Sequence, residues 1–207
     1  MPPSLPSQIG DPTWEIADWF PRQGFWTEPD YLKLTESSNR LVELENGKLE
    51  VLTMPTLEHQ LITIHLLVVL REFVLAKDLG MVLVAPHPTW LSKDNYREPD
   101  IVFKLRENLP AEGEKYFRGA DMVIEVVSDD KRSHERDYVK KRAHYAEAGV
   151  AEYWIVDPQE QRVIVLNLDG DAYAEHANLV AEGTATSKLL DGFAVDVAGV
   201  FAAGKKR

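Results

Sequence analysis

The sequence contains no cysteine among its 207 residues. This absence excludes disulfide bonds, thiolate metal sites and a cysteine nucleophile. Long apolar runs are also missing, because the richest segment, residues 61–70, contains His65 and is followed by Arg71 and Glu72. A membrane span needs roughly 20 predominantly apolar residues, and the N-terminal residues lack the basic and apolar regions of a secretory signal. We therefore expect a cytoplasmic protein that does not enter the membrane.

Basic residues are scarce as well, since 23 Lys and Arg stand against 34 Asp and Glu and the net charge is -11. Non-specific binding to a nucleic-acid backbone uses many Lys and Arg contacts, so this charge opposes it unless basic residues gather locally. They do gather between residues 131 and 142. If the partner is a nucleic acid, we expect four residues of this segment to form a patch that faces its phosphates: Lys131, Arg132, Arg136 and Lys140.

Several catalytic motifs are absent too. There is no G-x-S-x-G, no P-loop and no G-x-G-x-x-G, which excludes the usual serine hydrolases, nucleotidases and dinucleotide-binding enzymes. What the sequence does have, 44% apolar and 28% charged residues, is typical of a globular domain. The proline-rich residues 1–26 predict an N-terminal arm, and residues 27–207 predict one domain.

Hydrophobic patterns predict an α/β fold. Residues 40–54 alternate apolar and polar side chains around Asn46-Gly47, which is the sequence signature of a β-hairpin. A short helix is expected over residues 27–37, where Thr, Pro and Asp resemble a helix start. A long helix is expected over residues 58–79, because apolar residues recur there at helical spacing.

Short runs rich in β-branched and aromatic residues follow the long helix. They predict six strands, at residues 81–85, 100–103, 122–127, 152–156, 162–168 and 172–176. A second helix is expected between the third and fourth strands, with Val139, Ala143 and Ala146 on its buried face and Gly149 at its end. A strand, a helix and a strand over about 30 residues form a right-handed parallel crossover, whereas the short turns after it favour antiparallel pairing. The expected sheet is therefore mixed, with helices flanking it.

Two acidic residues occupy strand positions where apolar or neutral residues are expected. Glu125 lies within MVIEVV and shares a face of the strand with Val123 and Val127, and Asp100 opens the strand DIVF after Pro99. A buried carboxylate must be protonated, paired with a cation or bound to a metal. Glu125 alone could equally be the partner of a buried base, and Asp100 alone is more often a turn residue. Together the two favour a Mg²⁺ site.

Residues on the two helices extend this hypothesis. Glu58 heads the face of the long helix that should pack on the sheet, although an acid at a helix N-terminus is also favourable for purely electrostatic reasons. Asp137, Lys141 and Tyr145 recur every four residues along one side of the second helix, either as site residues or as an exposed ion-pair ladder. The six histidines are scattered along the chain. We interpret them as structural or solvated rather than as metal ligands.

Three segments of the chain together resemble a known family. REPDIVF, DMVIEVVS and RDYVKKRAHYAEAGVAEYWIVDP are similar to segments of the Uma family of bacterial restriction-endonuclease-like proteins, within the PD-(D/E)XK nuclease superfamily. The resemblance implies a restriction-endonuclease-like mixed β-sheet flanked by helices. It also implies a metal-dependent phosphodiesterase site at Glu58, Asp100 and Glu125, with the main-chain carbonyl of Val126 completing the metal shell. A homodimer is implied in the same way.

One position departs from the superfamily pattern. A lysine would follow the second acid as E-x-K, and here that position is Val127. Either Lys141 from the next helix replaces that lysine, or the chain cannot cleave. The hypothesis is therefore a Mg²⁺- or Mn²⁺-dependent endonuclease that acts on nucleic acid, with DNA as the expected polymer, through Asp100, Glu125, Lys141 and Glu58. Its alternative is a catalytically inactive nucleic-acid-binding or protein-interaction module with the same fold.

Overall fold

The computed structural model describes residues 20–37, 41–129 and 134–205. Within them, six strands form the main sheet in the order β11-β10-β9-β8-β6-β3. These strands are β3 (Gly80–Val84), β6 (Ile101–Leu105), β8 (Met122–Val126), β9 (Glu152–Asp157), β10 (Arg162–Asp169) and β11 (Ala172–Val180). All six correspond to runs that the sequence predicts. Strands β8 and β9 pair in parallel and the other neighbours pair antiparallel, so the sheet is mixed as expected.

A helical crossover joins the parallel strands β8 and β9. After residues 130–133, which lie outside the described part, it runs through η2 (Arg136–Lys141), a turn of π-helix, into α5 (Arg142–Glu147). Gly149 follows with a φ of 75°, the left-handed conformation that favours glycine after a helix. The parallel crossover predicted from the sequence is therefore confirmed, with its glycine end.

The buried side of this crossover helix differs from the prediction. Val139, expected in the core, is 61% exposed, and Ala143 is exposed as well. Asp137, Lys141 and Tyr145 point inward instead. Turns of π-helix are frequent at functional sites, and here the π turn and the α turn after it keep these three side chains on one side. Charged and aromatic groups therefore anchor this helix to the sheet.

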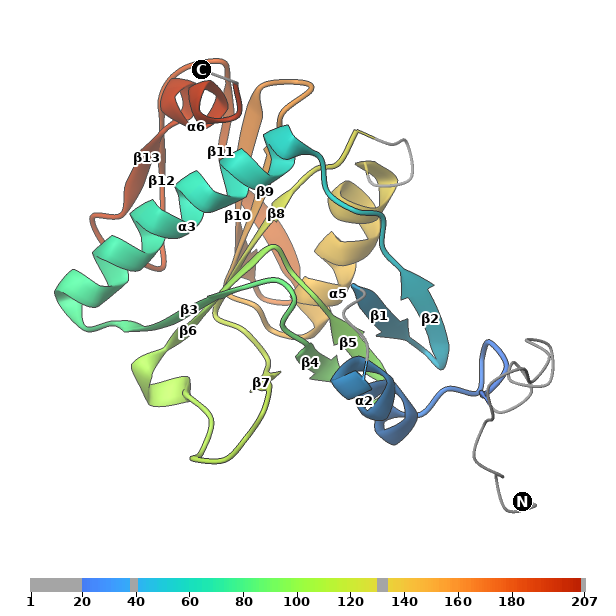
Figure 1. Cartoon of the computed structure of the whole chain (residues 1–207). Coiled ribbons are helices and arrows are strands. Elements are labelled where there is room, and N and C mark those ends of the chain that lie inside the picture. Colours follow the sequence, from blue (N-terminus) through green and yellow to red (C-terminus); the bar gives the residue numbers. More distant parts are fainter. Residues whose placement is uncertain (1–19, 38–40, 130–133, 206–207) are drawn as a thin grey trace, which may run out of the picture.

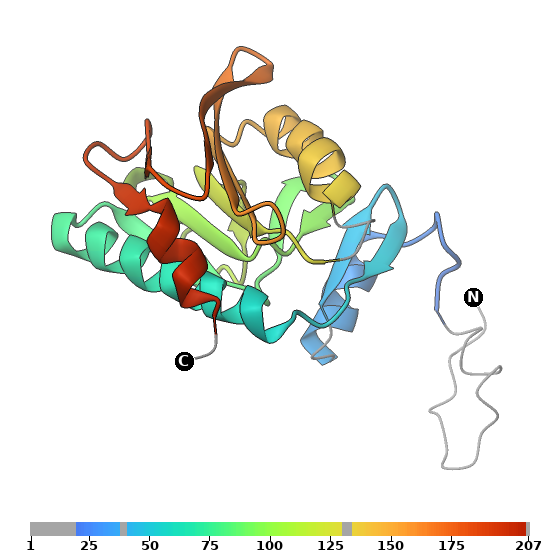
Figure 2. The same cartoon turned by 90° about the horizontal axis from the view of Figure 1, so that it is seen from above.

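Helices α3 (Leu57–Lys77) and α6 (Val197–Ala203) cover one face of the main sheet, and α5 covers the other (Figures 1 and 2). On α3, four buried residues recur every four positions and pack in the same core as the strands: Ile62, Leu66, Leu70 and Val74. The side chain of Thr56 caps the helix by accepting a hydrogen bond from the backbone N–H of His59.

Strand β8 alternates between the two cores because successive side chains point to opposite faces of a sheet. Ile124 and Val126 pack in the α3 core, whereas Val123 and Val127 pack in the core on the α5 side. Glu125 therefore points towards the crossover helix. This geometry decides which residues it can meet.

A second sheet carries the predicted hairpin. Its strand order is β2-β1-β5-β4-β7. The strands are β1 (Val42–Glu45), β2 (Lys48–Val51), β4 (Thr89–Ser92), β5 (Asn95–Arg97) and β7 (Phe117–Arg118). Asn46 and Gly47 join β1 and β2 with φ of 48° and 74°, as a tight hairpin turn requires. On β1, Leu44 packs in a core with Tyr31 of α2 (Glu28–Ser37), while Glu43 and Glu45 project to the opposite side.

Several short elements carry no signal that the sequence patterns could detect. They are β4, β5, β7, β12 (Thr184–Thr186), β13 (Ala194–Asp196) and α6. Each spans too few residues for a periodicity to emerge.

Helix α3 also has the length and composition of a membrane span, and 33% of that stretch is buried within the fold.

Candidate active site

Asp100 and Glu125 lie side by side on neighbouring strands. Ile101 pairs with Ile124 in the antiparallel ladder of β6 and β8, so extending the register by one residue places Asp100 opposite Glu125. The backbone N–H of Val126 donates a hydrogen bond of 2.8 Å to Asp100 Oδ2. The strand pairing itself thus brings together the two acids that the sequence singled out.

These acids border a cavity of about 390 Å³. Its polar lining includes His59, Glu98, Arg136 and Lys141 in addition to the two acids and the backbone of Val126. The side chain of Asp100 is 19% exposed and that of Glu125 is 4% exposed. The cavity therefore gives a ligand access to Asp100, with Glu125 at its buried end.

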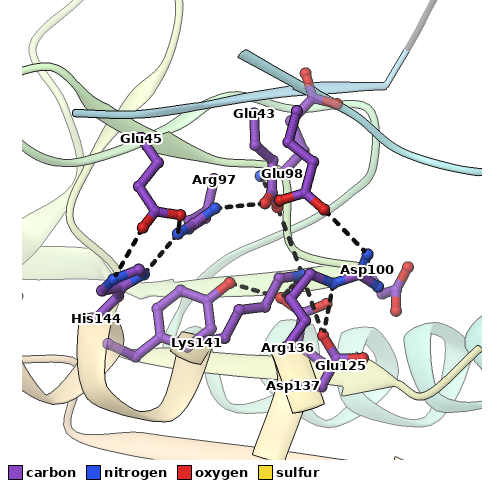
Figure 3. Close-up of polar contacts among 12 residues, drawn as sticks. Glu43, Glu45, Arg97, Glu98, Asp100, Glu125, Arg136, Asp137, Lys141 and His144 are labelled. Carbon is purple, nitrogen blue, oxygen red and sulfur yellow. Dashed lines mark hydrogen bonds and ion pairs between the residues drawn. The ribbon is translucent and has the colours of Figure 1, made fainter. Parts of the chain in front are cut away.

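Lys141 occupies the place beside the acids that Val127 cannot fill. Its Nζ lies 2.8 Å from Glu125 Oε1, 3.5 Å from Glu43 Oε1 and 3.6 Å from Asp137 Oδ1 (Figure 3). Burial alone would lower the pKa of this ammonium, but the carboxylates around it raise the pKa above its ordinary value. Lys141 is therefore a permanently charged cation inside the site.

Glu125 is a strongly perturbed acid of the cavity. Burial raises its pKa to about 7, the nearby Lys141 opposes that shift, and the negative charge of Asp100 adds to it. Glu125 Oε1 also accepts a hydrogen bond of 2.6 Å from the Tyr145 hydroxyl. The carboxyl group thus needs a cation nearby to remain ionised at neutral pH.

The hairpin strand β1 delivers a second buried acid, which the sequence patterns did not single out. Glu43 accepts a hydrogen bond of 2.7 Å from Arg97 and one of 3.2 Å from the backbone N–H of Glu98. Although burial alone would raise its pKa, Lys141 and Arg97 lower the pKa of Glu43 to about 2. Glu43 stays ionised and links the hairpin to Lys141.

Glu98 adds another carboxyl group to the cavity. It precedes Asp100 by two residues and accepts a hydrogen bond of 3.3 Å from the backbone N–H of Val42. Burial and the charge of Glu43 raise its pKa to about 7. The segment Glu98-Pro99-Asp100 therefore supplies two cavity acids, of which the sequence patterns identified only the second.

The prediction that Glu58 supports this site is wrong. The side chain of Glu58 is exposed and lies beside Gly204, at the C-terminal end of α6. The next residue, His59, lines the cavity instead. His59 Nε2 lies 3.2 Å from Asp100 Oδ2. Burial lowers the pKa of His59, but the hydrogen bond to Asp100 and the negative charges of Asp100 and Glu125 together outweigh burial and raise it. One residue turns a helix by about 100°, so Glu58 and His59 point in different directions and His59 is the one that meets Asp100.

The predicted phosphate-facing patch is only partly described. Lys131 and Arg132 lie outside the described residues. Arg136 lines the cavity, and its Nε donates a hydrogen bond of 3.1 Å to Asp137. Lys140 is exposed. The two described residues thus have different settings, one within the cavity and one on the surface.

A separate group of possible metal ligands lies at the end of β9. Ligand atoms of His134, Asp157 and Glu160 all lie within 4.8 Å of one another. The Asp157 carboxylate already accepts hydrogen bonds from the Tyr138 hydroxyl and from the backbone N–H groups of Gln159 and Glu160. It therefore acts as a turn cap, outside the cavity of Asp100 and Glu125.

The cavity residues fit a divalent cation. Five carboxyl groups lie in or beside the cavity, against three permanently charged cations from the same described region. The acids are Glu43, Glu98, Asp100, Glu125 and Asp137, and the cations are Arg97, Arg136 and Lys141. Asp137 Oδ2 is buried without a hydrogen-bond partner in the described part of the chain. Hard oxygen ligands held by Asp100, Glu125 and the backbone of Val126 would suit such an ion and offset the excess negative charge.

This mixed sheet with flanking helices, with two acids on adjoining strands and a lysine from the crossover helix, defines a restriction-endonuclease-like protein. The chain belongs to the Uma2 family, whose model is described as "Putative restriction endonuclease" and matches residues 28–198. The family expected from the three sequence segments is therefore confirmed. Family and fold together support a nuclease that acts on nucleic acid.

A solved structure has the same fold. It is the crystal structure of a "putative nuclease belonging to DUF820" from Anabaena variabilis ATCC 29413, with a TM-score of 0.72 and 20% sequence identity. The match covers 86% of this chain and 99% of that chain. No curated protein matches the sequence.

Proposed function

We propose that this protein is a Mg²⁺-dependent phosphodiesterase, with Mn²⁺ as a substitute, that cleaves nucleic acid internally and acts on DNA. The observation that carries this proposal is the buried Lys141 ammonium 2.8 Å from Glu125, beside Asp100 in one cavity. This arrangement supplies the acids and the cation of a phosphodiesterase site even though Val127 occupies the E-x-K position.

Each cavity residue has a role in this proposal. Asp100, Glu125 and the backbone carbonyl of Val126 would hold the metal, which when bound would polarise a phosphate oxygen and activate a water. Lys141 stabilises the negative charge that develops on the scissile phosphate, because a fixed cation in a dry site needs no reorganisation. His59 orients the Asp100 carboxylate through their contact of 3.2 Å.

A second candidate is a catalytically inactive module that binds nucleic acid or a protein. The observation that favours it is the tight pairing of Lys141 with three carboxylates at 2.8, 3.5 and 3.6 Å. A lysine held in this way could simply replace a metal as the counter-ion of Glu125. The two candidates differ in whether the acids bind a dication.

A metal titration with four variants separates the candidates. EDTA first removes any bound metal from the protein. Adding Mg²⁺ to 100 times its dissociation constant should then raise the free energy of unfolding by about 2.7 kcal/mol. Asp100→Asn and Glu125→Gln should remove this gain and remove cleavage. Lys141→Met should keep the metal-dependent gain and lose cleavage by about 10²- to 10³-fold, whereas the exposed Lys140→Met should retain both.

The measurements are thermal melting with and without metal, and cleavage of labelled oligonucleotides at the same metal concentrations. An unchanged melting temperature at millimolar Mg²⁺ and Mn²⁺, together with intact substrates, would support the inactive module. Cleavage that survives in Lys141→Met would instead remove the lysine from the mechanism while leaving the metal site in place.

We further propose a homodimer located in the cytoplasm. Support for the dimer comes from an apolar stripe on the outer face of α3, here called the outer stripe: Leu57, Ile64, Val68 and Leu75. These residues are 54%, 52%, 47% and 57% exposed, and their spacing of seven, four and seven residues follows the heptad seam of paired helices.

A further inference from the structure

The mouth of the cavity is mainly apolar, with Thr53 and Gln60 as polar exceptions, although its floor is acidic. Three chain segments form the rim, namely residue 41 before β1, residues 52–55 after β2 and residues 85–86 after β3. They contribute Leu41, Leu52, Met54, Pro55, Ala85 and Pro86. Met54 is 87% exposed. An apolar rim around polar groups is typical of pockets that enclose a small molecule or a single residue of a polymer.

The reacting groups lie too deep for a phosphate on the surface of a duplex. The side chains of Glu125 and Lys141 are 4% and 2% exposed, and the cavity of about 390 Å³ is the scale of a small-ligand pocket. Duplex DNA is stiff over a persistence length of about 50 nm, so deforming it until one of its phosphates enters such a cavity would cost free energy that an unpaired strand does not pay. Enzymes whose reactive groups lie in a pocket reach a nucleotide by taking a single strand or an extruded residue.

The charge around the cavity also favours an unpaired strand over a duplex. Among the described residues that line it, Arg136 and Lys141 carry a permanent positive charge, and both pair with acids. The whole chain has a net charge of -11. Duplex binding draws on many phosphate contacts and the release of their counterions, whereas a base of an unpaired strand can gain affinity from apolar contact.

We propose that the cavity takes one nucleotide of an unpaired strand, whose base packs on the Met54 rim while its phosphate reaches Asp100 and Glu125. The substrate class is therefore single-stranded nucleic acid, including frayed or flapped ends, rather than intact duplex. This inference rests on the proposed phosphodiesterase function, but binding tests it separately from cleavage.

The first experiment compares matched substrates. One sequence is prepared as a single strand, a blunt duplex and a duplex with a single-stranded flap, in DNA and in RNA. With Mg²⁺ present, we expect cleavage of the single strand and of the flap at least tenfold faster than cleavage of the duplex. Equal or faster duplex cleavage would overturn the inference and leave the proposed function standing.

If no substrate is cleaved, that result counts against the proposed phosphodiesterase function but not against the single-strand preference. A binding measurement then tests the preference. Asp100→Asn protein is titrated with the fluorescently labelled single strand and duplex, and anisotropy gives the two dissociation constants. At least tenfold tighter binding of the single strand supports the inference. Equal affinity, or tighter duplex binding, overturns it whether or not the wild-type protein cleaves.

Variants of the rim test the packing of the base. Met54→Ala should weaken single-strand binding about fivefold through lost apolar contact, and Met54→Trp should strengthen it because an aromatic ring stacks on a base. Val180→Ala is the matched control, since Val180 is also exposed, at 48%, but lies on β11. Because Met54 is exposed, these changes should leave the melting temperature unaltered. Equal affinities for the Met54 variants and the control would contradict the proposed contact.

Discussion

Charged side chains that the fold buries completely are the main feature of this protein at the scale of single residues. The side chains of Glu43, Glu125, Asp137 and Lys141 are each no more than 4% exposed. Removing a charge from water is costly, and a buried pair is stable only when its geometry and hydrogen bonds compensate. The network extends from Glu125 through Lys141 and Glu43 to Arg97. A network built at such cost favours a role in chemistry over a role in stability alone.

Glu43 and Glu45 offer a matched test of this burial. Both accept a hydrogen bond of 2.7 Å from Arg97, but the side chain of Glu43 is 0% exposed and that of Glu45 is 35% exposed. Glu43→Gln removes the buried negative charge that Arg97 and Lys141 share, so it should lower the free energy of unfolding at pH 7 by about 3–5 kcal/mol. Glu45→Gln should cost less than about 1 kcal/mol because water screens that pair.

The same variant predicts a pH dependence. The pKa of Glu43 falls from 4.5 to about 2 in the folded protein. A lowered folded pKa means that the ionised group contributes stability above pH 4.5, and that this contribution is lost as the pH falls towards 2. Urea denaturation at several pH values should therefore show the gap between wild type and Glu43→Gln narrowing over that window. A gap that stays constant would show that Glu43 acts through packing rather than through its charge.

At the scale of elements, the sequence patterns locate strands better than they locate the buried side of a helix. Glu125 interrupts an apolar strand, and both its strand and its face follow from the alternation of neighbouring residues. The same logic placed Val139 in the core of the crossover helix, where it is 61% exposed. An apolar pattern cannot identify the buried side of a helix when that side is made of Asp137, Lys141 and Tyr145. Hydrophobic periodicity does not detect charged residues that are buried because they pair with one another.

Contacts between distant segments were also beyond the sequence patterns. Glu43 reads as the polar face of a hairpin, and only the pairing of β1 with β5 brings it beside Arg97 and Lys141. His59 follows a residue that seemed the better ligand, Glu58. Local periodicity therefore predicted the strands, the hairpin and two of the acids, but not the residues that the tertiary fold adds around them.

The hairpin element can be tested through its turn. Gly47 has a φ of 74°, and an added Cβ would lie 2.8 Å from the carbonyl oxygen of Gly24. Gly47→Ala should therefore cost about 1–3 kcal/mol of stability and reduce cleavage, because a displaced β1 moves Glu43 away from Lys141. Gly170→Ala is the control: it shares a positive φ of 65°, but a Cβ there meets nothing within 4 Å.

Urea denaturation and oligonucleotide cleavage of the two glycine variants give the comparison. Both variants should lose some stability from the left-handed backbone, with the greater loss at Gly47. Activity should fall only in Gly47→Ala. Equal activity in the two variants would show that the hairpin does not position the lysine.

At the scale of the whole molecule, α3 presents apolar residues on two opposite sides. One side packs on the sheet through Ile62, Leu66, Leu70 and Val74, and the outer stripe lies roughly opposite to it because each residue turns the helix by about 100°. Contiguous exposed apolar residues often mark an interaction surface. The outer stripe therefore supports the proposal that a partner covers this side of α3.

The spacing of the outer stripe supports our proposal that a second copy of the chain covers it. Leu57 and Leu75 are each nine residues from position 66, and Ile64 and Val68 are each two residues from it. Two antiparallel copies of α3 that cross at this point would bring Leu57 of one against Leu75 of the other, and Ile64 against Val68. A twofold axis produces this kind of reciprocal contact, in which residue i meets j and j meets i.

Charge substitutions in the middle of the outer stripe test this pairing. The double variant Ile64→Glu with Val68→Glu places four carboxylates around the axis, so it should be a monomer in sedimentation velocity runs where the wild type is a dimer. The matching Ile64→Lys with Val68→Lys variant should also be a monomer alone, and a mixture of the two should restore dimers because Glu of one copy meets Lys of the other. Val180→Glu, an exposed apolar position on β11, should leave the dimer intact. A wild-type monomer at all concentrations, or vesicle binding that the double variants abolish, would assign the outer stripe to another role.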